Sequence, residues 1–331
     1  MQKAVTISSR KRMNKILIIG RIPPPNGGVT VHVSRLLQAL KQKKPECFEF
    51  TDYGKKPVKT CWQILCYKVI HLHSSNPYLQ LFLALICGLL FKKSIITFHG
   101  NLGRYSMIKN SAVNLSVFLS AVPVVLNAES LQKAQKLNKN ASLMTAFIPS
   151  SIDTTLNSQL LENLNKFRKK YEILFCTNAW KLTFDKQGKE IYGISGIIRN
   201  LEKADKAGLI ISDPSGSYAI HIQNTFGKIP DNIFIINEYH DFRNVLTLCD
   251  AFIRNTTTDG DSLSIHEAIE KNVAVFASDC VTRPAECMLF SNIEFADFVN
   301  ELKLAGSFKN PCSDKYANAV EKILNLYEIY L

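Results

Sequence analysis

Two carboxylates eight positions apart have the clearest chemical potential in this sequence. Asp259 lies in a polar turn and Glu267 on the short helix expected after it, within the stretch from Asp250 to Asp279. An acid on the turn and a second acid that lies one or two helical turns farther along can face the same ligand. Carboxylates so placed accept hydrogen bonds from sugar hydroxyls. In the alternative interpretation, Ser264 and Glu267 form an S-x-x-E capping box, and Glu267 only caps the helix.

The turn that carries Asp259 is suited to binding an anion. Backbone N–H groups at a helix N-terminus have no intrahelical partner, and the helix dipole adds positive potential there. We therefore expect an anion such as phosphate to bind at this turn. The residues that form it are Thr256, Thr257, Thr258, Asp259, Gly260, Asp261 and Ser262.

A glycine pair near the start of the chain gives a second candidate site. The run KILIIG, ending at Gly20, predicts a buried strand, and a Pro-rich turn, Gly27, Gly28 and an amphipathic helix follow it. Glycine lets the backbone approach a ligand closely at a helix N-terminus, where phosphate is favoured. The pair does not form G-x-G-x-x-G, so the dinucleotide fingerprint of dehydrogenases does not fit. A purely structural tight turn is the alternative.

Polar clusters follow several short apolar strands in the first half of the chain. His99 and Asn101 come directly after one such strand and just before Arg104, so we take them as site candidates. Ligands of parallel sheets bind at the carboxyl ends of strands, which is where these side chains stand. For His71 and His73, on a strand that runs into a loop, we expect a packed or solvent-facing role.

These candidates need a scaffold in which strands and helices alternate. Apolar strands recur around residues 68–72, 94–98, 123–126 and 143–148, and start again at 171–180. Such alternation predicts an α/β fold with parallel sheets covered by helices. No strong strand falls between residue 154 and Tyr171, which places the boundary there, with domains 1–160 and 161–331. The last segment has apolar residues at helical spacing, and we expect it to pack across a domain surface, with a return to the first domain as one option.

The basic charge of the chain is concentrated in its first half. The formal net charge is +12. Residues 1–150 hold 21 Lys and Arg against four acids, a net charge of +17, whereas the remainder is acidic. An anionic partner is therefore expected for the first half, and nucleic acid and an anionic membrane surface both fit. No nucleic-acid-binding module is recognisable, so we expect no nucleic acid.

Three further features concern the surroundings of the protein. The apolar run from Tyr78 to Phe91 is too short to span a bilayer, so we expect either a core helix or one that also touches membrane. Residues 1–15 are basic without an apolar core of signal-peptide length, so we expect no export signal. Nine cysteines without C-x-x-C spacing or histidines at ligand spacing argue against a zinc site or disulfides and favour a reducing cytosol.

Several of these segments together resemble one family of enzymes. GRIPPPNGGVTVHV at the start, TFHGN midway, IPSSID at the linker and DGDSLSIHEA late resemble retaining GT-B glycosyltransferases of the group 1 type over nearly the whole chain. The similarity is closest to bacterial enzymes that extend O-antigen or capsule repeat units on a lipid pyrophosphate. It implies two Rossmann-like doubly wound domains facing across a cleft, the second binding the donor and the first facing the acceptor and membrane.

The resemblance also implies roles for individual residues. Asp259 and Glu267 match two acids of the family that hold a nucleotide-sugar donor, with Glu267 on the ribose hydroxyls. His99 matches a histidine that sits over the donor sugar. The turn from Asp259 through Leu263 would contact the donor sugar and phosphates. We also expect Gly27 and Gly28 to take part in binding the donor nucleotide. We place Asn101 and Arg104 on the acceptor side.

One part of the family pattern is altered. The family offers an Arg, and a Lys directly before a Gly, to neutralise the donor diphosphate. Lys181 can stand for the Arg, but Tyr192 precedes Gly193, so the second charge must come from Lys186, Lys189 or Arg254. GT-B enzymes generally use such side chains and helix dipoles, so no metal or other cofactor is expected. The alternative is that Asp259 and Asp261, as D-x-D, hold a metal as in the other main glycosyltransferase fold.

The expected function is transfer of a hexosyl or N-acetylhexosaminyl group with retention. The donor would be a nucleotide-diphosphate sugar, with UDP favoured, and the acceptor a lipid-pyrophosphate-linked glycan of surface polysaccharide. The expected location is the cytoplasm, at the inner face of the cytoplasmic membrane. A UDP-sugar epimerase with this fold, a homologue that binds without turnover, and a nucleic-acid-binding protein remain alternatives.

Overall fold

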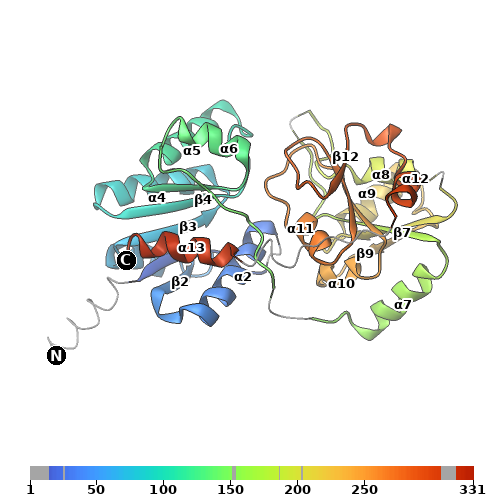
Figure 1. Ribbon diagram of the computed structural model, residues 1–331, viewed down its shortest axis with the longest axis horizontal. Coiled ribbons are helices and arrows are strands. Elements are labelled where there is room, and N and C mark those ends of the chain that lie inside the picture. The colour runs from blue at the N-terminus through green and yellow to red at the C-terminus, as the bar shows by residue number, and fades with distance from the viewer. Residues whose placement is uncertain (1–14, 25–26, 151–153, 186, 203, 307–317) are drawn as a thin grey trace. The chain divides into compact units, whose positions relative to one another are not determined.

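The computed structural model describes residues 15–24, 27–150, 154–185, 187–202, 204–306 and 318–331. The chain divides into two compact units, Met1–Ser151 with Asp314–Leu331 and Ile152–Ser313, which we call unit 1 and unit 2 (Figure 1). The basic N-terminal stretch, up to residue 14, and Lys186 lie outside the described residues. Among the described residues, no helix has both the length and the apolar character to cross a bilayer.

Unit 1 is built on a parallel sheet of six strands. The spatial order is β2-β1-β3-β4-β5-β6. The central strands β1, β3 and β4 are buried almost throughout, because a parallel sheet is covered on both faces. The strands are β1 (Ile16–Gly20), β2 (Phe48–Asp52), β3 (Val69–Ser74), β4 (Lys93–Phe98), β5 (Val122–Val125) and β6 (Ser142–Leu143).

Helices cover both faces of this sheet. One face packs against α2 (Gly28–Lys43) and α13 (Ala319–Glu328), whose apolar residues share a core with Ile16 and Ile18. The opposite face, with Leu17 and Ile19, packs against four other helices. These are α3 (Pro57–Cys66), α4 (Pro77–Leu89), α5 (Met107–Leu119) and α6 (Ala128–Gln135), and a short 3-10 helix, η1 (Pro45–Cys47), precedes β2.

The terminal helix α13 corrects the predicted domain boundaries. We assigned it to domain 161–331, but its residues Val320, Ile323, Leu324 and Tyr327 are buried in the core of unit 1. It lies beside α2, as Figure 1 shows, and Lys43 forms an ion pair with its Glu321. The units also divide after residue 151 rather than after residue 160.

Unit 2 repeats the same architecture. Its six parallel strands have the order β12-β11-β10-β7-β8-β9. They are β7 (Ile173–Asn178), β8 (Ala207–Ser212), β9 (Ile233–Ile236), β10 (Ala251–Arg254), β11 (Ala274–Ser278) and β12 (Cys287–Phe290). The helices are α7 (Ser158–Arg168), α8 (Ile194–Leu201), α9 (Ser217–Phe226), α10 (Phe242–Leu246), α11 (Leu263–Glu270), η2 (Ile293–Phe295) and α12 (Phe298–Ala305).

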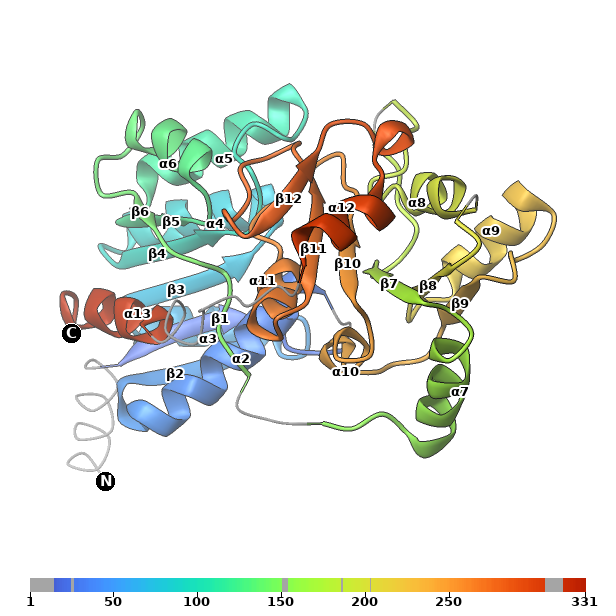
Figure 2. The same cartoon turned by 45° about the vertical axis from the view of Figure 1, so that its right-hand side comes forward.

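The helices of unit 2 again form two layers. Helices α7, α10 and α11 share a core with Leu174 and Phe252, whereas α8, α9 and α12 share the other core with Phe175 and Ile253 (Figure 2). The α/β prediction with doubly wound parallel sheets is therefore confirmed in each unit.

Three local predictions were wrong or incomplete. The strand expected at 143–148 is limited to Ser142–Leu143. Farther along, the carbonyl oxygens of Ala146 and Ile148 contact the side chains of His32 and Arg35 on α2. The segment between the domains contains α7, whose Leu160, Leu164 and Phe167 are buried in unit 2. Strand β2 was not predicted, since its Glu and Asp residues interrupt the apolar pattern.

Candidate active site

The strand order marks one edge of unit 2 as the place for a ligand. From β7 the chain adds β8 and β9 on one side of the sheet and later adds β10, β11 and β12 on the other side. The direction in which strands are added therefore reverses between β7 and β10. Doubly wound sheets bind ligands at the carboxyl ends of strands at such a reversal. Asn178 ends β7 and Arg254 ends β10, and the Asn178 Oδ1 atom lies 3.4 Å from Arg254 Nη1.

Asp259 lies at this edge between two arginine side chains. Its Oδ2 atom accepts hydrogen bonds from Arg254 Nε at 3.0 Å and from Arg283 Nη1 at 2.9 Å. Its Oδ1 atom lies 3.3 Å from Arg254 Nη2 and accepts from the backbone N–H of Gly260. The carboxylate therefore anchors two guanidinium groups, and its role toward a donor sugar stays a prediction.

The three charges are buried together. Burial alone would raise the pKa of Asp259, but the guanidinium groups of Arg254 and Arg283 outweigh it and hold that pKa below its ordinary value. The side chain of Arg283 is only 2% exposed. Two cations facing one carboxylate leave a net positive charge beside the predicted anion site.

Arg283 is a candidate site residue that the sequence analysis missed. It follows β11, and its Nε donates to the carbonyl of Ser278 while its Nη2 donates to Thr256 Oγ1 at 2.9 Å. Strand β11 lies next to β10 in the sheet. The same rule that selected residues after other strands would have selected this one, had the segment after β11 been included.

Arg254 also lies beside the position where the family pattern was altered. Its guanidinium is 5.0 Å from the centroid of the Tyr192 ring. The next residue, Gly193, has φ 52°, and a Cβ there would come within 2.8 Å of the Asn255 carbonyl oxygen, so only glycine fits. Of the two described cations considered for the second diphosphate charge, Lys189 and Arg254, Arg254 is the one placed at the strand reversal.

Lys181, considered for the Arg position, and Lys189, considered for the second charge, both lie in the loop after β7. Lys181 is exposed in a bend three residues beyond the strand. Lys189 is also exposed, in a turn held by its backbone N–H bond to Asp185 Oδ1. Glu190 accepts a hydrogen bond from the backbone N–H of Ile194 at 2.7 Å, at the N-terminus of α8. The role of Lys181 remains a prediction.

Helix α11 begins at this end of the sheet. Ser262 is its N-cap residue, and the Ser262 side chain makes no capping hydrogen bond. Leu263 is the first helical residue, so the half-buried turn of Thr258, Asp259 and Gly260 leads directly into the helix. A first turn with this geometry can donate backbone N–H groups to an anion.

The capping-box interpretation of Glu267 is wrong. Ser264 lies inside α11 rather than at its N-cap, and its Oγ accepts a hydrogen bond from Asn178 Nδ2 at 2.7 Å. Glu267 is 5% exposed on the next turn of the helix. Its negative charge is among those that raise the pKa of Arg243 against the opposing effect of burial.

Asp261 does not converge on a shared point with Asp259. The Asp261 carboxylate contacts His266 Nε2 on the following helix, whereas Asp259 faces Arg254 and Arg283. The two carboxylates of the D-x-D pattern therefore have different partners, two guanidinium groups for Asp259 and an imidazole for Asp261. This arrangement does not support the pattern as a metal-binding pair.

Unit 1 has its own strand reversal, between β1 and β3. Helix α2 begins there at Gly28, with Gly27 as N-cap, and a Cβ on either glycine would meet no atom within 4 Å. Thr30 Oγ1 accepts from the Gly27 N–H at 3.0 Å and lies 3.0 Å from the Gly27 carbonyl. The open space around the glycines would let a ligand approach the backbone. Their role in donor binding stays a prediction.

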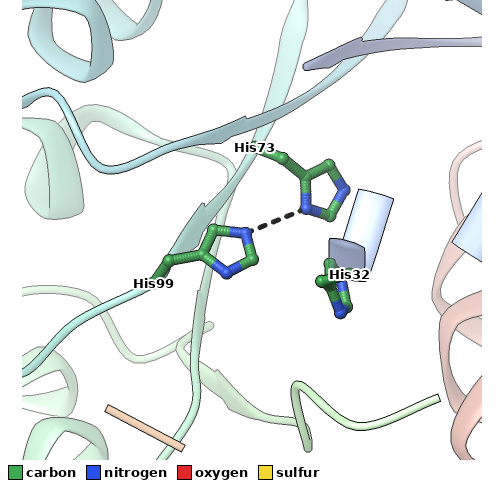
Figure 3. A group of neighbouring side chains, drawn as sticks. All are labelled: His32, His73 and His99. Atoms are coloured by element: carbon green, nitrogen blue, oxygen red, sulfur yellow. Dashed lines mark hydrogen bonds between the residues drawn. The ribbon is translucent and has the colours of Figure 1, made fainter. Parts of the chain in front are cut away.

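His99 belongs to a cluster of histidines at this edge of unit 1, shown in Figure 3. His73 Nδ1 and His99 Nε2 are 3.2 Å apart, so one nitrogen donates and the other accepts. His32, on α2, lies against both rings. Its Nδ1 atom is 2.6 Å from the carbonyl oxygen of Ala146, to which it can donate. His71 and His73 are both buried, as the packed interpretation predicted.

Burial favours the neutral form of His71, His73 and His99. It lowers the pKa of His71 to about 3 and lowers the pKa of His73 and His99 well below the usual histidine value. His71 is held between Tyr327 Oη at 2.7 Å and Thr97 Oγ1 at 2.8 Å. Neutral imidazoles can donate to or accept from hydroxyl groups, and His99 is the least buried of the cluster.

The same cluster is the group that could hold a metal among the residues described in the structure. His32, His73 and His99 each offer a ring nitrogen, and these atoms lie within 4.8 Å of one another. Three separate elements bring them together, which is why their sequence spacing showed no ligand pattern. Because His73 and His99 already bond to each other, the rings are held by the protein itself.

Asn101 and Arg104 lie beside this cluster. Asn101 Oδ1 accepts from Asn127 Nδ2 at 2.7 Å, and the Arg104 guanidinium packs over Tyr105, 4.7 Å from the ring centroid. The guanidinium also covers Gly100, where a Cβ would come within 2.2 Å of Arg104 Cζ. A small hollow opens here, lined in part by Ser75, Gln80, Phe98, His99, Asn101 and Tyr105.

The fold of the chain is that of GT-B glycosyltransferases. The chain is similar to the crystal structure of Anabaena Alr3699/HepE in complex with UDP and glucose, with a TM-score of 0.68 and 13% identity over 96% of this chain and 100% of that one. It is also similar to the lipopolysaccharide outer core galactosyltransferase WaaB, with a TM-score of 0.62 and 13% identity over 95% of this chain and 99% of WaaB.

A third similar structure is an alpha,alpha-trehalose-phosphate synthase (UDP-forming) from Burkholderia vietnamiensis. Its TM-score is 0.58, with 11% identity over 96% of this chain and 94% of that one. The sequence itself matches no family model and no functionally curated protein. The likeness is thus one of fold across the whole chain at low sequence identity.

Proposed function

We propose that this protein is a retaining glycosyltransferase that uses a UDP-sugar as donor. The acceptor would be a lipid-pyrophosphate-linked glycan of surface polysaccharide, at the inner face of the cytoplasmic membrane. The observation that carries the proposal is the buried group of Arg254, Asp259 and Arg283 at the strand reversal of unit 2. Its net positive charge lies beside the N-terminus of α11, where a diphosphate would be favoured.

The chemistry follows from what a leaving diphosphate requires. The bond between the anomeric carbon and the diphosphate oxygen breaks, and negative charge develops on that oxygen. Arg254, Arg283 and the α11 dipole would stabilise this charge. The acceptor oxygen would bond to the anomeric carbon on the same face, and its proton would pass to the departing diphosphate. This route uses no side-chain nucleophile and no metal.

Three comparisons favour UDP as the nucleotide. HepE has been crystallised with UDP and with UDP-glucose, and the Burkholderia synthase is a UDP-forming enzyme. WaaB, a galactosyltransferase of the lipopolysaccharide outer core, supports a glycolipid acceptor. In this chain Glu267, which lies one turn into α11, would accept hydrogen bonds from the ribose hydroxyls.

Titration of UDP and GDP into the purified protein tests the donor site. The wild type should bind UDP more tightly than GDP, and Glu267→Ala should weaken UDP binding by about tenfold to a hundredfold, because two hydrogen bonds to a carboxylate are lost. Glu301→Ala, an exposed acid on α12, is the matched control and should bind as the wild type does. Equal UDP affinity in Glu267→Ala, or no binding by any of them, would contradict the proposal.

Product analysis tests the reaction itself. A panel of UDP-sugars incubated with the protein and water should show slow release of UDP, with the α-configured sugar formed first. Release of the opposite anomer would contradict retention. Conversion to a different UDP-sugar without release of UDP would identify an epimerase.

A further inference from the structure

Exposed apolar side chains gather on the outer surface of three helices in unit 1. Tyr78, Phe82, Leu85 and Leu89 form a stripe along α4, at helical spacing. The side chain of Trp62 on α3 is 66% exposed, and that of Leu89 at the end of α4 is 74% exposed. The large apolar side chains on this surface are Val58, Trp62, Leu65, Tyr78, Phe82, Leu85, Leu89, Leu90, Phe91, Met107, Ile108, Leu115, Phe118 and Leu119. We call this surface the α3–α5 face.

The three helices lie on one side of the sheet and are joined to one another. Their inner residues Ile64, Leu83 and Val117 share one core. Helices α4 and α5 pack side by side (Figures 1 and 2). Lys92, just after α4, donates to the carbonyls of Leu65 and Tyr67 at the end of α3. The exposed side chains of α3, α4 and α5 therefore belong to one surface rather than to scattered positions.

Phe91 occupies a place at which glycine would be preferred. It follows α4 with φ 53°, and its exposed fraction of 96% is the largest of these side chains. Its N–H donates to the Gly88 carbonyl, and the Lys92 N–H donates to the Cys87 carbonyl at 2.8 Å, the pattern of a Schellman motif. A left-handed backbone is costly for a bulky residue, so folding alone does not account for Phe91.

The charge of this face selects one kind of partner. No Asp or Glu occurs between Asp52 and Glu129, the segment that contains all three helices. Exposed cations on it and at its margins are Lys55, Lys56, Lys59, Lys68, Lys93 and Lys109. A second copy of the chain would place lysines opposite lysines, with no acid on the face to pair with them. An anionic lipid surface offers both an apolar layer and negative headgroups.

We propose that the α3–α5 face of unit 1 docks on the surface of an anionic lipid bilayer, with Phe91, Leu89 and Trp62 inserted among the lipids. The apolar side chains enter the boundary between headgroups and acyl chains, while the lysines remain at the level of the phosphates. This docking identifies the surface that would bring the protein to the lipid-linked acceptor of the proposed function. The docking proposal rests on the proposed function only where it names the lipid-linked acceptor. Vesicles without any glycolipid are enough to test the docking itself.

Flotation of the full-length protein with vesicles tests the proposal. The wild type should float with vesicles of phosphatidylcholine and phosphatidylglycerol, and float less with phosphatidylcholine alone or at high salt. Phe91→Gly should lower the affinity by about tenfold, because one large apolar side chain no longer inserts. Its melting temperature should equal or exceed that of the wild type, since glycine suits the left-handed position.

Matched controls keep the outcome clear. Phe295→Ser removes an apolar side chain that is 84% exposed in unit 2 and should float as the wild type does. Lys59→Glu should reduce flotation by about fivefold, whereas Lys322→Glu, on α13 over the opposite face of the same sheet, should leave it unchanged.

Three results would overturn the docking proposal. They are no flotation of the wild type, equal flotation of Phe91→Gly and the wild type, and a dimer that Phe91→Gly dissociates in sedimentation without lipid. UDP titration separates this proposal from the donor site. Phe91→Gly should bind UDP as the wild type does, so a failure of docking leaves UDP binding intact.

Discussion

At the scale of single residues, the proposed donor site in unit 2 depends on how its charged side chains are paired. Asp259 and Glu267 looked equivalent as hydrogen-bond acceptors, but the fold places them differently. Asp259 is enclosed by Arg254 and Arg283, whereas Glu267 is buried a turn into α11. One carboxylate between two guanidinium groups holds both in fixed positions and leaves one positive charge for a ligand. Preorganised charge of this kind is effective because it needs no rearrangement during the reaction.

Replacing Arg283 tests this arrangement. Arg283→Ala removes the spare positive charge, since Arg254 alone then neutralises Asp259. We expect kcat/KM for UDP-sugar hydrolysis to fall by about 10²–10³-fold, with weaker UDP binding. Arg283→Lys should restore only part of the activity, because an ammonium group cannot reproduce the contacts to Asp259, Thr256 and Ser278 together.

The control for Arg283 is a second Arg–Asp pair. Arg168 bonds to Asp250 directly before β10, at the opposite end of that strand. Arg168→Ala should leave the kinetics of hydrolysis unchanged. Similar losses in Arg168→Ala and Arg283→Ala would mean that the effect arises from general destabilisation, against our assignment.

At the scale of elements, helix α13 is tied to the sheet of unit 1 through a histidine. Tyr327 on α13, His71 on β3 and Thr97 on β4 form one buried hydrogen-bonded chain. Residues of α13 come last in the sequence, yet they complete the core over β1 and β3. Local sequence could predict the helix. Which unit the helix packs against was decided by the apolar face of the unit 1 sheet that it covers.

This chain of contacts predicts a dependence of stability on pH. Burial lowers the pKa of His71 to about 3 in the folded state, while an unfolded histidine titrates near 6.5. The unfolded state therefore binds more protons below about pH 6.5, and stability falls as the pH drops from there toward 3. Each such histidine contributes up to about 1.4 kcal/mol per pH unit to the free energy of unfolding.

Urea unfolding between pH 7 and pH 5 measures this effect. The wild type should lose stability over that range, and His71→Gln should show a slope smaller by about one proton. His221→Gln, on α9 of unit 2, serves as the comparison for a histidine outside this chain of contacts. Identical slopes in all three proteins would show that His71 is not buried in its neutral form.

At the scale of the whole molecule, the two units differ in charge and in proposed task. The basic excess belongs to residues 1–150, which form most of unit 1 and the whole α3–α5 face. The described part of unit 2 contains the pair of arginines around Asp259. Under the two proposals, unit 1 would bind an anionic surface and unit 2 would bind a small anionic ligand.

Hydrogen exchange tests this division of tasks. Saturating UDP should slow amide exchange in β10, β11 and α11, and should stabilise the protein by about 2.7 kcal/mol at a hundred times Kd. Treatment with a chelator should not change this protection, because arginines rather than a metal would neutralise the diphosphate. Loss of protection that added Zn²⁺ or Mg²⁺ restores would show that a metal takes part.

Much of each unit could be predicted from local sequence. Runs such as KILIIG before the glycine turn, or AFIR before the threonine turn, are apolar because both faces of a parallel strand are covered. Their alternation with helical segments indicated the doubly wound sheets, and the polar residues at their carboxyl ends indicated where a ligand would bind. These features depend on neighbours within a few residues, so the order of the chain is enough to show them.

Other features depended on the tertiary structure. Arg283 meets Asp259 across 24 positions of the chain, and His32, His73 and His99 meet from α2, β3 and the end of β4. Strand order in the sheet decides such meetings, and no local periodicity encodes it. The short β6, the burial of α7 and the return of α13 were decided in the same way. The amino-acid sequence by itself determined the elements and the chemistry that each one carries; packing of distant elements decided which of those groups act together.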